Sequence, residues 1–191
     1  MKLIKDFSMI ISGLAALLVF IAGLTSVLNI AKPSLISGFL LVPIFITLMV
    51  CIHYNSKKEI KLFSLLSVQF ATMYGILISF NYYLQLALIP NNSSGLELFV
   101  MSNPNSMMWV IEVLGYFFMG LSTLFMVPVL GSTLLERLIK IFFSLNGFLG
   151  IGGLIGYASG LSIDIFMIGL MSWNIIMPIA FLLIFFHLRN T

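Results

Sequence analysis

The sequence predicts an all-α, polytopic membrane protein with six transmembrane helices and both termini in the cytoplasm. Three observations predict this class. Hydrophobic residues make up 61% of the chain and charged residues only 8%, whereas soluble domains carry about 25% charged residues. The apolar residues occur in six long stretches, and a bilayer is crossed by about 20 such residues in a helix. The basic residues lie in the connectors and near the ends of the chain, and their uneven distribution between the two sides is typical of a membrane protein under the positive-inside rule.

We predict that the six spans form one membrane domain over residues 1–191, because no polar stretch is long enough for a soluble domain. The predicted spans are 9–30, 34–53, 62–89, 107–130, 141–158 and 164–187. The first has an apolar run that is too long for a signal peptide, so we expect a retained helix. The second, fourth and sixth contain Pro43, Pro128 and Pro178, which membrane helices tolerate at the cost of a kink.

The orientation follows from the basic residues. With six spans, eight of the nine Lys and Arg residues fall on the same side as the termini, and only Lys32 falls on the other. This asymmetry predicts cytoplasmic termini. It also explains the net charge of +3 as a topology signal, so we expect the lipid bilayer and no nucleic acid as a partner. The one long external connector, 90–106, is predicted to hold a short interfacial or re-entrant segment.

Polar side chains in the third and fourth spans reach a similar depth. The third span runs outward, which places Asn81 roughly 12 Å below its outer end and Gln85 one turn above Asn81. The fourth runs inward and places Glu112 roughly 10 Å below the same surface. Consecutive antiparallel helices are usually neighbours. We therefore expect a buried polar patch in the outer half of the bundle.

Helical periodicity assigns faces to this patch. Trp109, Glu112 and Tyr116 share one face of the fourth span. We expect Glu112 to accept hydrogen bonds from the amide of Asn81 or Gln85 and from the Tyr116 hydroxyl. Trp173 and Asn174 of the last span are further candidates, and Asn29, Tyr157 and Asp164 are candidates at the outer end.

Three functions are compatible with the patch. The first is binding or transport of a small amphipathic or cationic molecule in a pocket centred on Glu112, formed mainly by the third, fourth and sixth helices. The second is a non-catalytic structural or assembly role, with Glu112 joining two helices. The third is an intramembrane enzyme that uses Glu112 as an acid or base, but no catalytic motif supports it.

No cofactor or metal is expected. Cys51 is the only cysteine, which excludes a thiolate cluster. His53 and His187 fall at predicted cytoplasmic helix ends, where a haem between them is the alternative to ordinary interfacial histidines. The fifth span carries a small-residue stripe, Gly152, Gly156 and Gly160, which predicts close helix packing. That packing is either internal or with an oligomer or partner subunit.

One resemblance rests on short motifs. The series Asn81-Tyr82-x-x-Gln85, Asn103-Pro104 and Glu112-x-x-Gly115-Tyr116, followed by the tryptophan Trp173 in the last span, covers roughly residues 75–175. It resembles a family of small, uncharacterised prokaryotic multi-pass membrane proteins. The resemblance implies a prokaryotic plasma membrane protein, and it implies no activity.

Overall fold

The protein folds into six long α-helices, as the sequence predicts. The computed structural model describes residues 2–28, 30–88, 99–100, 103, 106–160 and 163–190, so the predicted interfacial segment within 90–106 lies almost wholly outside the described residues. The helices are α1 (Lys2–Val27), α2 (Ala31–Asn55), α3 (Lys61–Leu88), α4 (Met107–Met126), α5 (Leu134–Ala158) and α6 (Ile163–Asn190), with short 3-10 turns η1 (Lys58–Ile60) and η4 (Val127–Val129). All six are long and apolar enough to cross a membrane.

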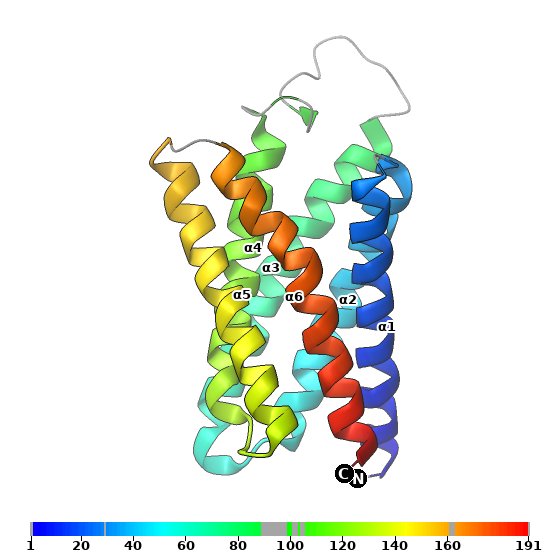
Figure 1. Cartoon of the computed structure of the whole chain (residues 1–191), viewed down its shortest axis with the longest axis vertical. Coiled ribbons are helices and arrows are strands. Elements are labelled where there is room, and N and C mark those ends of the chain that lie inside the picture. The colour runs from blue at the N-terminus through cyan, green and yellow to red at the C-terminus, as the bar shows by residue number, and fades with distance from the viewer. Residues whose placement is uncertain are drawn as a thin grey trace.

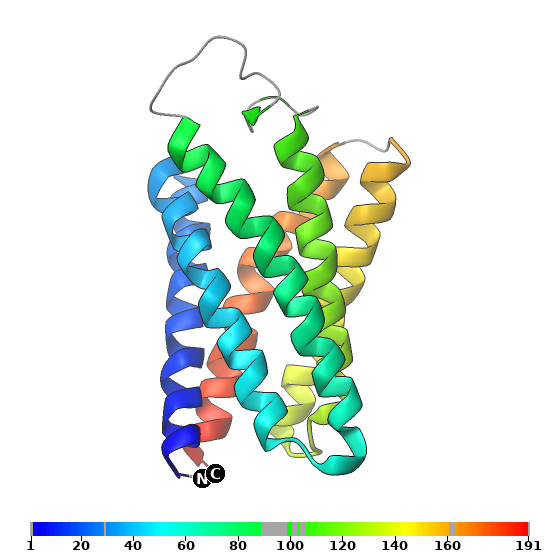
Figure 2. The same cartoon turned by 180° about the vertical axis from the view of Figure 1, so that it is seen from behind.

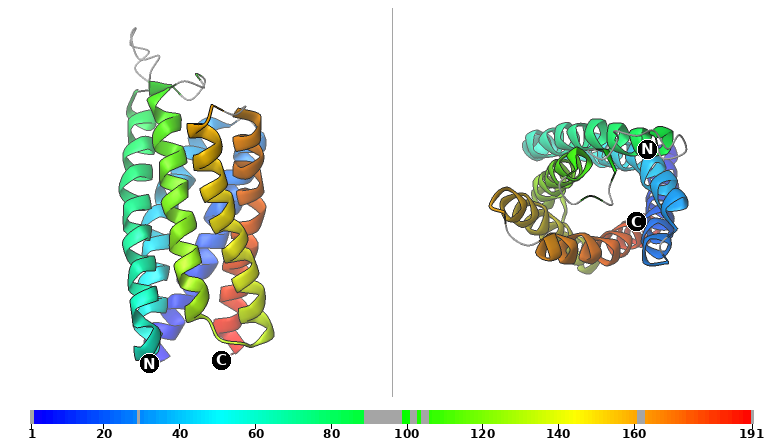
Figure 3. Two further views of the ribbon diagram at one scale, coloured as in Figure 1. Left: turned by 90° about the vertical axis from the view of Figure 1, so that its left-hand side faces the viewer. Right: turned by 90° about the horizontal axis from the view of Figure 1, so that it is seen from above.

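The six helices form a closed ring (Figures 1 and 2). Each helix packs against its neighbours in sequence, and α6 closes the ring against α1. Seen along the axis, they surround a common centre (Figure 3). The start of α1 and the end of α6 lie at the same end of the ring. We call it the lower end. The upper end is where α3 ends and α4 begins.

The helix boundaries differ from the predicted spans mainly at the lower end. α1 begins at Lys2 and α5 at Leu134, seven residues before each predicted span. In both cases the extra helix contains charged residues, which hydropathy excludes from a span. A helix can extend beyond the hydrocarbon layer because its backbone hydrogen bonds are satisfied internally. Hydropathy therefore located the apolar part of each helix and not its full length.

Apolar side chains fill the middle of the ring. Phe45, Tyr74 and Phe181 are each at most 1% exposed. Phe45 contacts the other two rings edge-on, with centroids 5.5 Å from Tyr74 and 6.2 Å from Phe181. α2 and α6 are separated in the ring by α1. The contact between Phe45 and Phe181 is therefore made on the inside of the ring.

Glycines bring α5 close to α4, although not those of the predicted stripe. A Cβ at Gly150 would lie 2.8 Å from the backbone oxygen of Tyr116, and a Cβ at Gly147 would lie 2.1 Å from Leu124 Cγ. Such backbone proximity is what small residues permit in membrane bundles. Nearby, Asn146 Nδ2 donates to Thr123 Oγ1 at 3.0 Å.

The three glycines of the predicted stripe have different surroundings. Gly156 is buried, whereas Gly152 is exposed and a Cβ added to it would meet no described atom within 4 Å. Gly160 follows the end of α5 with φ 68°, where glycine is favoured because it has no Cβ. The prediction that the stripe packs inside the bundle is therefore wrong for Gly152 and Gly160. Contact of Gly152 with another molecule stays a prediction.

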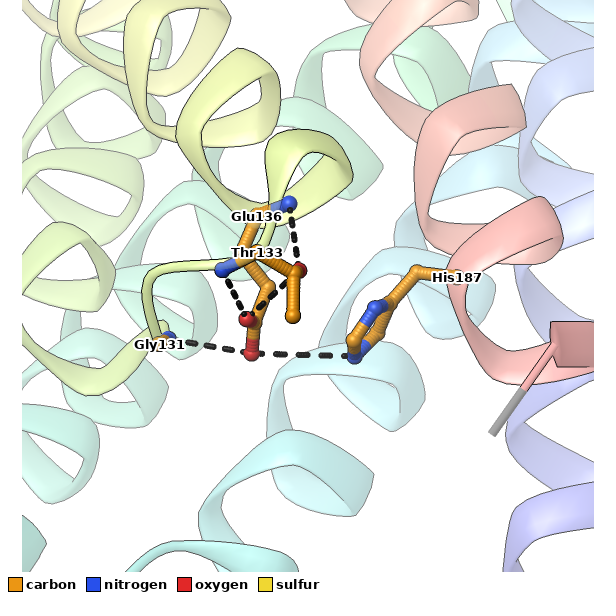
Figure 4. A network of polar contacts seen from close by, with 4 residues as sticks. All are labelled: Gly131, Thr133, Glu136 and His187. Carbon is orange, nitrogen blue, oxygen red and sulfur yellow. Dashed lines mark hydrogen bonds and ion pairs between the residues drawn. The ribbon is translucent and has the colours of Figure 1, made fainter.

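A capping box begins α5 at the lower end (Figure 4). Thr133 Oγ1 accepts from the backbone N–H of Glu136 at 3.3 Å, and Glu136 Oε2 accepts from the backbone N–H of Thr133 at 3.0 Å. Glu136 Oε1 also accepts from the Gly131 N–H at 3.0 Å and lies 3.7 Å from His187 Nε2 of α6. The start of α5 is thus joined to the end of α6.

Replacing Thr133 with alanine should lower the free energy of unfolding by about 1 kcal/mol, because the first turn of α5 loses its side-chain cap. Thermal unfolding in detergent measures this loss. Ser132→Ala is the matched control. Arg137 Nε donates to the backbone oxygen of Ser132, and alanine keeps that oxygen. Equal melting temperatures for Thr133→Ala and the wild type would show that the cap contributes nothing.

Candidate functional site

A cavity of about 200 Å³ opens inside the upper half of the ring. Its lining comes from five helices: Ala22 and Ser26 of α1, Ser34, Leu35, Gly38 and Leu41 of α2, Tyr74 and Tyr82 of α3, Trp109, Glu112 and Tyr116 of α4, and Trp173 and Asn174 of α6. Ser26 is exposed and Glu112 is 3% exposed. The lining thus extends from the molecular surface to a buried carboxylate.

Glu112 is held by two side chains of α3. Asn81 Nδ2 donates to Glu112 Oε2 and also, at 3.2 Å, to the backbone oxygen of Met108. The Tyr82 hydroxyl donates to Glu112 Oε1 at 2.8 Å. Gln85 Nε2 donates to Asn81 Oδ1 at 3.0 Å, which orients the Asn81 amide. These bonds satisfy both carboxylate oxygens and fix the direction of the carboxylate.

The expected donors are therefore partly correct. Asn81 is one of the two amides proposed for Glu112, whereas Gln85 bonds Asn81 instead. The expectation for Tyr116 is wrong, because Tyr82 makes the hydroxyl bond and the Tyr116 hydroxyl lies 3.3 Å from that of Tyr82. Tyr82 is adjacent to Asn81 and three residues before Gln85, so it falls at the edge of the same broad helix face. The position of Tyr82 on the same face as Asn81 and Gln85 is the sequence signal that could have identified it as a donor to Glu112.

Tyr82 reaches its position because α2 has a glycine opposite it. A Cβ at Gly38 would lie 2.2 Å from Tyr82 Cε2, which is far inside van der Waals contact. Only a residue without a side chain fits there. The α1 and α2 part of the lining was missed because small residues such as Ala22, Ser34 and Gly38 carry no distinctive sequence signal. The prediction of a pocket made mainly by the third, fourth and sixth helices is thus too narrow.

The walls of the cavity are largely aromatic. Five of the lining residues are aromatic: Tyr74, Tyr82, Trp109, Tyr116 and Trp173. The rings of Tyr116 and Trp173 meet across the inside of the ring, with centroids 5.1 Å apart. Trp173 is 6% exposed, and its indole N–H has no hydrogen-bond acceptor among the residues that the structure describes. A buried donor of this kind normally has a partner.

The cavity lining includes a single ionisable carboxylate and, among its described residues, no Lys, Arg or His. A buried charge is costly unless an opposite charge or hydrogen bonds compensate it. Glu112 receives its hydrogen bonds from neutral groups. The arrangement can therefore stabilise a cation that enters the cavity, and aromatic faces add cation–π attraction.

The remaining candidates have varied positions. Asn174 lines the cavity, Gln85 is buried behind Asn81, and Trp109 packs with Val113 against Tyr157. Asn29 and the side chain of Asp164 lie outside the described residues.

Metal and haem chemistry gain no support from the described parts of the chain. They contain no cluster of three His, Cys, Asp or Glu side chains that could hold a metal. His53 Nδ1 lies 2.8 Å from Ser64 Oγ, whereas His187 pairs with Glu136. The two histidines thus have different partners.

Comparison with known proteins adds no family to this description. No family model matches the chain, no curated protein matches it, and no solved structure matches it.

Proposed function

We propose that this membrane protein binds a small organic cation in the upper cavity, as the substrate-binding step of a transporter. The observation that carries the proposal is the lining of the cavity. It combines a buried carboxylate, Glu112, with five aromatic side chains and no basic side chain among its described residues. A quaternary or substituted ammonium group is recognised by aromatic faces together with an anionic group. Trp173 supplies one of these aromatic faces.

The cavity volume restricts the size of the ligand. An apolar cavity of about 150 Å³ accommodates benzene, and the upper cavity is about 200 Å³. It therefore suits a molecule slightly larger than benzene and excludes most drug-sized ligands, whose pockets are about 300–1,000 Å³. Choline is a suitable probe, since it combines a trimethylammonium group with a hydroxyl.

The location of the protein is part of the proposal. The excess of Lys and Arg at the lower end favours cytoplasmic termini, so the upper cavity would face the outside. The motifs that resemble small prokaryotic multi-pass proteins include Asn81, Tyr82, Glu112 and Tyr116, which lie together beside the cavity. The resemblance supports our proposal that the protein lies in a prokaryotic plasma membrane.

Glu112→Gln tests the binding step. Glutamine preserves the size of the side chain and an oxygen acceptor for one donor, but it removes the negative charge. We expect the variant to fold and to lose at least tenfold in choline affinity, measured by calorimetry on purified protein in detergent or nanodiscs. In 3,3-dimethyl-1-butanol a neutral carbon replaces the quaternary nitrogen of choline. This compound, called dimethylbutanol below, should bind the wild type more weakly than choline does.

The assembly alternative predicts a different result. If Glu112 only joins α3 to α4, then Glu112→Gln and Glu112→Leu change stability without changing ligand binding. Wild-type choline affinity in both variants would refute the role of the charge. Preferential binding of dimethylbutanol by the wild type would show an apolar pocket instead of a cation site.

A further inference from the structure

A second cavity of about 180 Å³ lies at the lower end of the same ring. Its described lining shares no residue with that of the upper cavity, and its polar members are Ser8, Asn55, Ser56, Glu136 and His187. Cys51 of α2 also lines it. The two cavities thus have similar volumes, and each contains a carboxylate at its wall.

A short apolar barrier separates the cavities. On α2, Leu41 lines the upper cavity and Cys51 the lower, a separation of about 15 Å along the helix. On α6, Asn174 and Ile184 line the upper and lower cavities, respectively. Phe45 and Phe181 lie between these positions on α2 and α6, and Tyr74 of α3 lines the upper cavity. In the buried centre, Phe45 contacts both Tyr74 and Phe181. We call these three residues the aromatic plug.

Both helices that supply a phenylalanine to the plug are weakened beside it. Pro43 precedes Phe45 by two residues in α2, and Pro178 precedes Phe181 by three residues in α6. A proline inside a helix removes one backbone hydrogen bond, which facilitates local bending. Broken or kinked helices beside a central site are a recurring feature of membrane transporters. The two phenylalanines of the plug are therefore carried by the two helices with internal prolines among the six described, and Tyr74 is carried by α3.

We propose that the axis of the ring is a translocation path with two chambers, and that the aromatic plug is its gate. The upper cavity is the substrate chamber and the lower cavity is the release chamber. Bending of α2 and α6 at their prolines separates Phe45 from Phe181 and connects the chambers. This proposal rests on the proposed function for the identity of the substrate but not for the existence of the path.

Cys51 provides a test of the path that needs no ligand. It is the only cysteine of the chain and lines the lower cavity. The membrane-impermeant, cationic thiol reagent MTSET modifies accessible cysteines, and mass spectrometry measures the modification. With cytoplasmic termini, spheroplasts expose the upper face to the reagent and inside-out vesicles expose the lower face. In the wild type, the reagent should reach Cys51 from the lower face only. In Phe45→Ala/Phe181→Ala, it should reach Cys51 from both faces, at least tenfold faster from the upper face than in the wild type.

Two further variants make the result decisive. Phe148→Ala removes a phenylalanine that is 67% exposed on α5, and it should leave the wild-type pattern unchanged. Phe45→Ala alone serves if the double variant does not fold, as judged by size-exclusion chromatography and circular dichroism. Folded plug variants in which Cys51 keeps the wild-type pattern, or is modified from neither face, would overturn the path.

A transport assay separates the path from the binding site. Proteoliposomes with the wild-type protein should take up radiolabelled choline saturably, and Glu112→Gln should abolish the uptake. Choline binding without uptake, with Cys51 not reached from the upper face in the plug variant, would overturn the translocation path and leave the binding proposal standing. Failure of choline to bind, with Cys51 reached from both faces in the plug variant, would refute the cation site and support the path.

Discussion

Gly150→Ala is expected to destabilise the bundle by about 1–3 kcal/mol, the range for overpacking a filled interior. The added methyl would lie 2.8 Å from the backbone oxygen of Tyr116 and 3.3 Å from Gly120 Cα. Neither atom can rotate away, because both belong to the backbone of α4. The helices α4 and α5 must therefore separate, and the separation also weakens the nearby bond between Asn146 and Thr123. Thermal unfolding in detergent, followed by circular dichroism, measures the loss.

Gly152→Ala is the matched control on the same helix. Gly152 is exposed and has no described neighbour near the added methyl. Alanine has a higher helix propensity than glycine by about 1 kcal/mol, so this variant should be as stable as the wild type or more stable. Similar destabilisation by both substitutions would contradict the assigned packing. Loss of a dimer on Gly152→Ala would instead reveal the partner contact predicted for the glycine stripe.

The sequence predicted the six helices because hydropathy reports a property of each helix by itself. It also predicted that Asn81 and Glu112 lie at the same depth, since depth follows from the helical rise and the direction of each span. The closed order of the ring was not predictable in this way. Neither hydropathy nor the short connectors determine whether α6 packs against α1, which depends on the complementary shapes of all six helices.

The cavity was harder to predict than the polar patch. Glu112 attracts notice because a carboxylate in an apolar run is unusual, whereas Gly38 and Ser34 are ordinary residues in membrane helices. Their importance comes from what stands opposite them across the helix interface. The choice of Tyr82 over Tyr116 as the donor to Glu112 depends on the same interface, because Gly38 provides the space for the Tyr82 ring. A pattern within one helix cannot contain that information.

Gly38→Ala should therefore damage the site, although it replaces none of the polar residues of the site. The new methyl would lie 2.2 Å from Tyr82 Cε2, so the ring must move and its 2.8 Å hydrogen bond to Glu112 must break. Both residues line the cavity, so moving the ring also changes the shape of the cavity. We expect at least a tenfold loss of choline affinity, measured by calorimetry, together with a lower melting temperature.

A double-mutant cycle shows whether the clash with Tyr82 is the cause. Tyr82→Ala removes the ring, so Gly38→Ala should add little further loss of stability in that background, although it is costly alone. Tyr82→Phe keeps the ring and removes only the hydroxyl, so Gly38→Ala should stay costly in the Tyr82→Phe background. Additive losses in the Tyr82→Ala cycle would mean that Gly38 acts through another neighbour. Because melting temperature is the readout, this cycle tests the architecture of the cavity whether or not choline is the ligand.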